Sequence, residues 1–142
     1  MQLKGSHVIV TGGSSGIGRA TAKLLIENGA TVLITGRNEE KLNKIAAEIA
    51  AIPLHFDISD LDSIKEKAAE AINLLDGKID ALINNAGIGV FPKLGDITAE
   101  DLESVYKTNV FGLTLLTQEI VAVFKSQNYG NIVNLGSTAS LK

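Results

Sequence analysis

The chain has 142 residues, of which 45% are hydrophobic and 20% are charged, and its formal net charge is −3. These proportions are typical of one globular domain and exclude a disordered chain. The acidic balance excludes a basic face for nucleic acid or for a membrane surface, and the absence of cysteine excludes disulfides and thiolate metal sites.

The chain begins with Met1 and shows no long apolar run of the kind that a signal peptide carries. The most apolar later stretch, residues 110–124, contains Gln118 and Glu119 and is too short to span a bilayer. We therefore expect a soluble, cytoplasmic protein.

The first strong feature is a short apolar strand that runs into a glycine-rich turn. The strand, residues 8–10, is entirely β-branched, as is usual for a strand buried on both faces. Glycines follow at positions 12, 16 and 18, where a side chain would block a positive φ or keep a phosphate away from the backbone. The helix that begins near Ser15 directs free amides over the turn. The stretch predicts a phosphate site, with a purely structural turn as the alternative.

Helices and strands alternate along the rest of the chain. Gly29 ends the first helix, Asn38 caps the second, Ser59 or Asp60 caps the third, and Thr98 with Asp101 forms a capping box for a long fourth helix. Further strands are predicted at residues 31–35, 54–56, 79–83 and 132–135. The periodicity predicts buried stripes on the first helix (Ile17, Ala20, Thr21, Leu24, Leu25) and on the long helix (Leu102, Val105, Tyr106, Leu113, Leu116, Ile120, Phe124).

This alternation predicts the fold class. Strands that are separated by helices must pair in parallel through crossover connections, and right-handed crossovers produce a doubly wound sheet. We therefore expect an α/β, Rossmann-type domain over residues 1–142, with five parallel strands and helices on both faces.

Ligands of such sheets bind outside the carboxyl ends of the strands, so residues that directly follow strands are candidates for the site. Arg37 follows the second strand about twenty residues after the glycines, where arginine accepts the 2′-phosphate of NADP and an acidic residue selects NAD. A solvated surface arginine is the alternative. Asp57 follows the third strand and could simply cap the next helix. Ser137 follows the fifth strand and is expected to point into the crevice. Asn109 falls on the inner stripe of the long helix and must find hydrogen-bond partners there.

Several motifs resemble those of the short-chain dehydrogenase/reductase family, in the family's order. They are Thr11-Gly12-x-x-x-Gly16-x-Gly18, the tetrapeptide Asn84-Asn85-Ala86-Gly87, the segment Asn109-Val110-Phe111-Gly112, and Ile132-Val133-Asn134 before Ser137. The resemblance extends from Thr11 to Ser137 but covers only part of the family's longer domain.

The resemblance implies an oxidoreductase that prefers NADP(H), with NAD(H) as the alternative, and that acts on a small carbonyl or alcohol substrate. It implies that Asp57 and the amide of Ile58 hold the adenine. It gives Ser137, rather than Ser140, a hydrogen bond to the substrate oxygen, and it associates Asn109 with a helix irregularity and a proton relay. The cofactor-binding residues that it implies are Thr11, Gly12, Ser14, Ser15, Gly16, Ile17, Gly18, Arg37, Asp57, Ile58, Asn85, Ala86 and Gly87, and no metal site is expected.

One motif of the family has no counterpart here, namely the acid/base pair Tyr-x-x-x-Lys. The residues four positions after Tyr106 and Tyr129 are Val110 and Val133. Two hypotheses follow: the chain is the cofactor-binding portion of an oxidoreductase, or it is a non-catalytic dinucleotide-binding or scaffold module. The long helix near 99–126 is apolar on nearly all sides around residues 110–116. In the family this helix packs against its copy in a second subunit, so we also expect a homo-oligomer.

Overall fold

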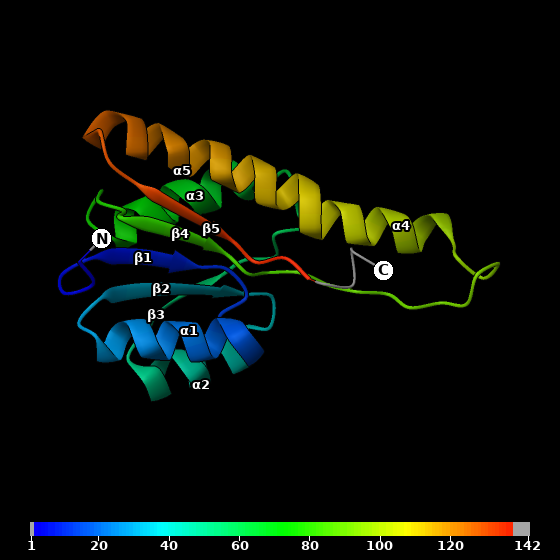
Figure 1. The fold of residues 1–142 in the computed structure, drawn as a ribbon, viewed down its shortest axis with the longest axis horizontal. Coiled ribbons are helices and arrows are strands. Elements are labelled where there is room, and N and C mark those ends of the chain that lie inside the picture. The colour runs from blue at the N-terminus through cyan, green and yellow to red at the C-terminus, as the bar shows by residue number, and fades with distance from the viewer. Residues whose placement is uncertain (1, 138–142) are drawn as a thin grey trace.

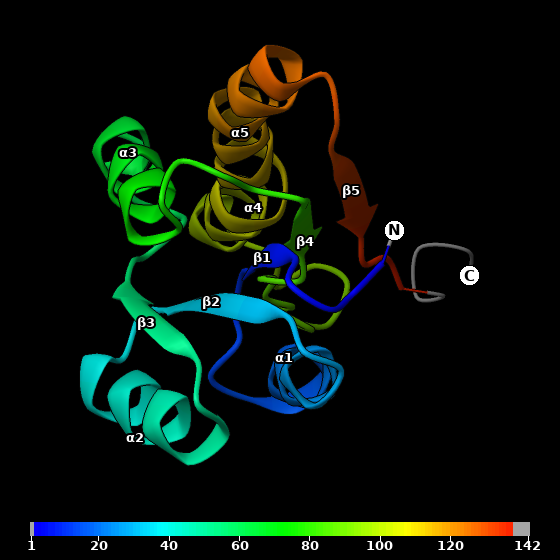
Figure 2. The same cartoon turned by 90° about the vertical axis from the view of Figure 1, so that its left-hand side faces the viewer.

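The computed structural model describes residues 2–137 and shows a single sheet of five parallel strands in the order β3-β2-β1-β4-β5 (Figure 1). The strands are β1 (His7–Val10), β2 (Thr31–Gly36), β3 (Ile52–His55), β4 (Ala81–Asn84) and β5 (Asn131–Asn134). Helices α1 (Gly16–Glu27) and α2 (Glu39–Ile49) cover one face. The other face carries α3 (Ile64–Leu74) and the continuous rod of α4 (Ala99–Tyr106), η1 (Lys107–Gly112) and α5 (Leu113–Gln127) (Figure 2). The predicted doubly wound α/β fold is confirmed.

The core consists of two apolar layers, one on each face of the sheet. Successive strand residues point to opposite faces, so Ile9 joins the layer under α3 and α5 while Val8 and Val10 join the layer over α1 and α2. Strands that are buried on both faces require a continuous apolar sequence, which explains the β-branched run of β1.

The helix caps agree in part with the sequence. Asn38 accepts a hydrogen bond from the Lys41 amide at 2.8 Å, and Thr98 and Asp101 form the predicted capping box. The predicted cap of the third helix is wrong, because α3 begins at Ile64 with Ser63 in the cap position. The residues between β3 and α3 instead form turns that stay near the carboxyl end of β3.

The predicted buried face of α1 is also wrong. Ile17 and Leu24 are 67% and 61% exposed, whereas Gly18 and Ala22 are buried against the sheet. Small residues one turn apart let the helix lie close to the strands, and this close approach turns the larger apolar side chains away from the sheet.

The predicted long helix is not regular. Its central part, η1, is a π-helix, and only α5 lies along the sheet, where Leu116, Ile120 and Phe124 are buried. Helix α4 extends past the carboxyl ends of the strands (Figure 1), so the predicted inner residues Leu102 and Tyr106 are more than half exposed. The apolar periodicity of the sequence thus continues into α4, where the sheet no longer covers the helix.

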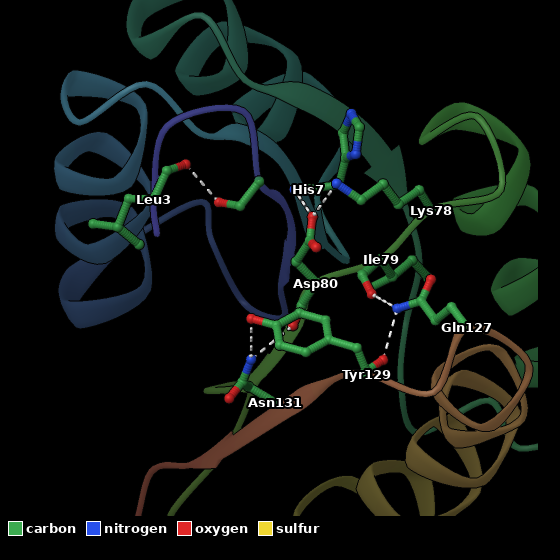
Figure 3. A network of polar contacts seen from close by, with 9 residues as sticks. Leu3, His7, Lys78, Ile79, Asp80, Gln127, Tyr129 and Asn131 are labelled. Atoms are coloured by element: carbon green, nitrogen blue, oxygen red, sulfur yellow. Dashed lines mark hydrogen bonds and ion pairs between the residues drawn. The ribbon is translucent and has the colours of Figure 1, made fainter. Parts of the chain in front are cut away.

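A polar network joins β1, β4 and β5 at the amino-terminal edge of the sheet (Figure 3). The carboxylate of Asp80, a residue that is 7% exposed, accepts a hydrogen bond from the His7 amide at 2.7 Å and pairs with the Lys78 ammonium at 3.2 Å. The Asn131 side chain donates to the Asp80 carbonyl at 3.1 Å and to the Tyr129 hydroxyl at 3.0 Å. The network anchors β5, the outer strand, at the edge opposite the candidate site.

Candidate functional site

A cavity of about 340 Å³ opens at the carboxyl ends of β1, β2, β3 and β4. The chain passes from β1 outward to β2 and β3 and then returns to the other side of β1 as β4, so the cavity lies at the switch point of the sheet. The residues that line it are Gly12, Ser14, Ser15, Gly16, Ile17, Thr35, Gly36, Arg37, Phe56, Asp57, Ile58, Asn85, Ala86, Gly87, Ile88 and Thr108.

The glycines of the first turn meet different requirements. Gly12 and Gly16 have φ values of +66° and +52°, a region that favours glycine. At position 18 only glycine leaves room for the Asn85 side chain, because a Cβ there would lie 2.3 Å from the Asn85 side-chain nitrogen. Gly13, which the sequence analysis missed, is needed for the same reason, since its Cβ would lie 2.6 Å from the Ile34 side chain.

Thr11 links the glycine turn after β1 to the segment after β4, which together line the cavity. Its hydroxyl oxygen accepts hydrogen bonds from the amides of Asn85 at 3.0 Å and of Ala86 at 2.9 Å. In return the Asn85 side chain donates to the carbonyls of Thr11 at 2.8 Å and of Gly12 at 3.2 Å. Thr11 is 1% exposed, and neither it nor Gly18 lines the cavity. These two predicted cofactor residues support the site from beneath.

The first turn of α1 forms the floor of the cavity near Ser14, Ser15 and Ile17. Within the described residues the Ser15 side chain makes no capping hydrogen bond, so the first-turn amides remain available to a ligand. These amides and the positive end of the helix dipole suit a phosphate group. The geometry therefore fits the predicted phosphate site.

Arg37 lines the cavity at the end of β2, and its guanidinium makes no ion pair with any described residue. Gly36 lies beside Ser14, so close that a Cβ at position 36 would lie 3.0 Å from the Ser14 hydroxyl. Arg37 and the Ser14 hydroxyl thus both belong to the lining of the cavity at the end of β2. Such a pair of donors suits a phosphate better than a ribose hydroxyl.

Asp57 and Ile58 line the cavity at the end of β3. One carboxylate oxygen of Asp57 accepts hydrogen bonds from the Ser59 amide at 3.0 Å and the Ser59 hydroxyl at 2.7 Å, so the residue stabilises its own turn and does not cap α3. Within the described residues, the other oxygen and the Ile58 amide make no hydrogen bond. One acceptor and one donor are thus available to an adenine ring.

The two predicted catalytic residues do not line the cavity. Asn109 lies in η1, where its side chain donates to the Ile88 carbonyl at 2.8 Å and accepts from the Ile88 amide at 2.9 Å. The predicted hydrogen-bond partners of the Asn109 side chain are therefore backbone groups of the loop after β4. Ser137 is the last described residue and is exposed, and Ser140 lies outside the described residues.

Five further residues line the cavity that the sequence analysis did not select: Thr35, Gly36, Phe56, Ile88 and Thr108. The first three directly precede Arg37 or Asp57, so their position at the strand ends was a usable signal. Thr108 is buried within the π-helical turn, and its place at the site follows from that irregularity.

The described part of the chain shows neither a metal-ligand cluster nor a membrane-spanning helix. No group of three His, Asp or Glu side chains within residues 2–137 could hold a metal ion. Over the same residues, no helix has both the length and the apolar character to cross a membrane.

The chain is similar in sequence and in fold to known proteins. The family model for short chain dehydrogenases matches residues 6–142. A 3-oxoacyl-[acyl-carrier-protein] reductase of Thermotoga maritima is 34% identical over 99% of this chain and 59% of its own length. An NADP-dependent 3-hydroxy acid dehydrogenase of Schizosaccharomyces pombe is 35% identical over 97% of this chain and 56% of its own length. The crystal structure of a metagenomic short-chain oxidoreductase in complex with NADP superposes with a TM-score of 0.89, at 31% identity over 96% of this chain and 64% of that one. The chain thus spans less than two thirds of these proteins.

Proposed function

Because this chain belongs to the short-chain dehydrogenase family, we propose that it is the NADP(H)-preferring cofactor-binding portion of an oxidoreductase acting on a carbonyl or alcohol substrate. One observation carries the proposal: the glycine turn, the Arg37 guanidinium and the Asp57–Ile58 turn line one cavity at the switch point of the sheet. A bound nicotinamide would supply or accept the hydride.

Each wall of the cavity has its own part in the proposal. The amides at the start of α1 hold the pyrophosphate, and Arg37 with Ser14 holds the 2′-phosphate. The free oxygen of Asp57 and the amide of Ile58 hold the adenine. The segment from Asn85 to Gly87, which Thr11 holds in place, borders the cofactor further along. NAD(H) is the alternative cofactor.

The proposed chemistry places the substrate oxygen near Ser137, which would donate a hydrogen bond where negative charge develops. A serine hydroxyl is a poor acid near neutral pH, and a positioned general acid contributes typically ~10²–10⁴-fold to the rate. Since Tyr-x-x-x-Lys is not among these 142 residues, we propose that this chain alone binds NADPH and does not turn over substrate. The absence of this motif from the 142 residues also suits a second candidate function, a non-catalytic dinucleotide-binding or scaffold module.

The test is a titration of the 142-residue chain with NADPH and NADH by fluorescence, followed by an NADPH oxidation assay against a panel of aldehydes and ketones. We expect NADPH to bind more tightly than NADH, without turnover. Where the coding sequence continues past Lys142, the same assay on the longer product separates the two candidates, because only an oxidoreductase gains activity. Robust turnover by the 142-residue chain would contradict the proposal.

We also propose that the chain forms a homo-oligomer through the rod of α4, η1 and α5. Its exposed apolar side chains are Leu102, Tyr106, Val110, Phe111 and Leu115, and the helices that carry them run on from one another as one rod (Figure 1). A cytoplasmic location and a lack of nucleic-acid partners remain predictions from composition.

A further inference from the structure

Gly112, the last residue of η1, is buried against the turn that holds the adenine end of the cavity. A Cβ built on Gly112 would lie 2.0 Å from the carbonyl oxygen of Ile58 and 2.9 Å from its Cγ1. The nearer obstacle is a backbone atom, which cannot rotate away as the end of a side chain can. The bare backbone of the π-helical turn therefore packs directly on the backbone of a residue that lines the cavity.

We propose that Gly112 is a positioning residue for the adenine half of the cofactor, acting through the backbone of Ile58. The proposal rests on the proposed function, since it concerns the same cavity. A ligand that uses the Ile58 amide and the free oxygen of Asp57 requires both groups at fixed positions, and a shift of even about 0.5 Å weakens such a site. Gly112 provides the wall against which this turn is fixed.

A side chain at position 112 would push the helix and the turn apart, because each is held by contacts of its own. The helix is held by the two hydrogen bonds between Asn109 and Ile88 and by the buried side chains of Leu116 and Ile120. The turn is held by short-range bonds from Ser59 and Asp60 back to Asp57 and by the Ile58 side chain, which is buried in the same core as Leu116 and Ile120. The two backbones would have to separate by roughly 1 Å or more to reach an ordinary contact distance, which displaces the Ile58 amide relative to the rest of the cavity.

The test uses 2′,5′-ADP, which carries the adenine and the 2′-phosphate without the nicotinamide. Its affinity is measured by calorimetry for the wild type, for Gly112→Ala and for the control Gly130→Ala. A Cβ at Gly130 would lie 2.1 Å from the Phe124 ring, an overlap of similar size at the far end of α5. We expect Gly112→Ala to weaken binding about tenfold or more, which corresponds to the loss of one hydrogen bond, and Gly130→Ala to change it less than twofold.

A second measurement needs no variant and so does not depend on whether Gly112→Ala folds. Hydrogen exchange of the wild type is compared with and without 2′,5′-ADP. We expect slower exchange both at residues 57–60 and in η1, with no change in the last two turns of α5. Protection confined to residues 57–60, or equal affinities of the two variants, would overturn the role of Gly112. A wild type that binds neither 2′,5′-ADP nor NADPH would instead contradict the proposed function itself.

Discussion

The side chain of Asn109 makes both of its hydrogen bonds to a single residue, Ile88. Its nitrogen donates to the Ile88 carbonyl at 2.8 Å and its oxygen accepts from the Ile88 amide at 2.9 Å. This pair joins the π-helical turn to the loop after β4, which lines the cavity. A side-chain amide is the one group in the standard set that can both donate to and accept from a peptide unit in this way.

Replacing Asn109 by aspartate keeps the acceptor for the Ile88 amide and removes the donor to the Ile88 carbonyl. We expect the free energy of unfolding to fall by about 1–3 kcal/mol, because a carboxylate would face an unpaired carbonyl. Hydrogen exchange at residues 88–89 should become faster. Asn73→Asp, on the exposed surface of α3, is the control and should change neither quantity. Unchanged exchange in Asn109→Asp would show that the pair does not hold the loop.

Replacing Arg37 by alanine removes the guanidinium at the end of β2. A charge-assisted hydrogen bond to the 2′-phosphate contributes about 1.5–3 kcal/mol, so the ratio of NADPH to NADH affinity should fall roughly tenfold to a hundredfold. Fluorescence titration with each cofactor measures this ratio. Arg19→Ala is the matched control, because Arg19 pairs with Glu48 and does not line the cavity. A wild type without preference, or a preference that survives the substitution, would contradict the assignment.

Replacing Thr11 by valine keeps its shape and removes the acceptor for the amides of Asn85 and Ala86. We expect the free energy of unfolding to fall by about 1–3 kcal/mol and the affinity for NADPH to fall with it. Chemical denaturation and titration measure the two effects. Thr31→Val, at an exposed position of β2, should leave both unchanged. A loss of stability with unchanged cofactor affinity would show that Thr11 supports the fold but has no role in cofactor binding.

Replacing Asp80 by alanine removes the acceptor for the His7 amide and the partner of Lys78 (Figure 3). Hydrogen bonds to charged groups contribute about 1.5–3 kcal/mol, and we expect a loss of stability in that range. Because the network lies at the edge of the sheet opposite the cavity, cofactor affinity of the folded protein should not change. Asp62→Ala, on the exposed surface, is the control. A stability equal to that of the control would show that the network is not required.

Replacing Leu115 by lysine places a charge on the exposed apolar surface of α5. If that surface pairs two copies of the chain, burial of the charge opposes association, and sedimentation should show a shift toward the monomer. Leu24→Lys is the control, since Leu24 is exposed on α1 at the other face of the sheet. A wild type that sediments as a monomer at high concentration would remove the proposed oligomer.

The sequence by itself determined the features that depend on near neighbours. The alternation of apolar strands with periodic helices predicted the parallel sheet, and the caps at Asn38 and Thr98 involve residues only three positions apart. The candidate ligands Arg37 and Asp57 followed from topology, because parallel strands bring their carboxyl ends to one edge. These inferences need no knowledge of how distant segments pack.

Only the tertiary structure decided the features that join distant segments. Thr11 supports residues 74 and 75 positions away, and Gly112 meets the backbone of Ile58, which lies 54 positions earlier in the chain. The tertiary structure also decided which residues of α1 are buried and that none of α4 is, because burial depends on where the sheet ends and how closely each helix approaches it. Local periodicity records which residues share a helix face, but the packing of other elements determines which face becomes buried.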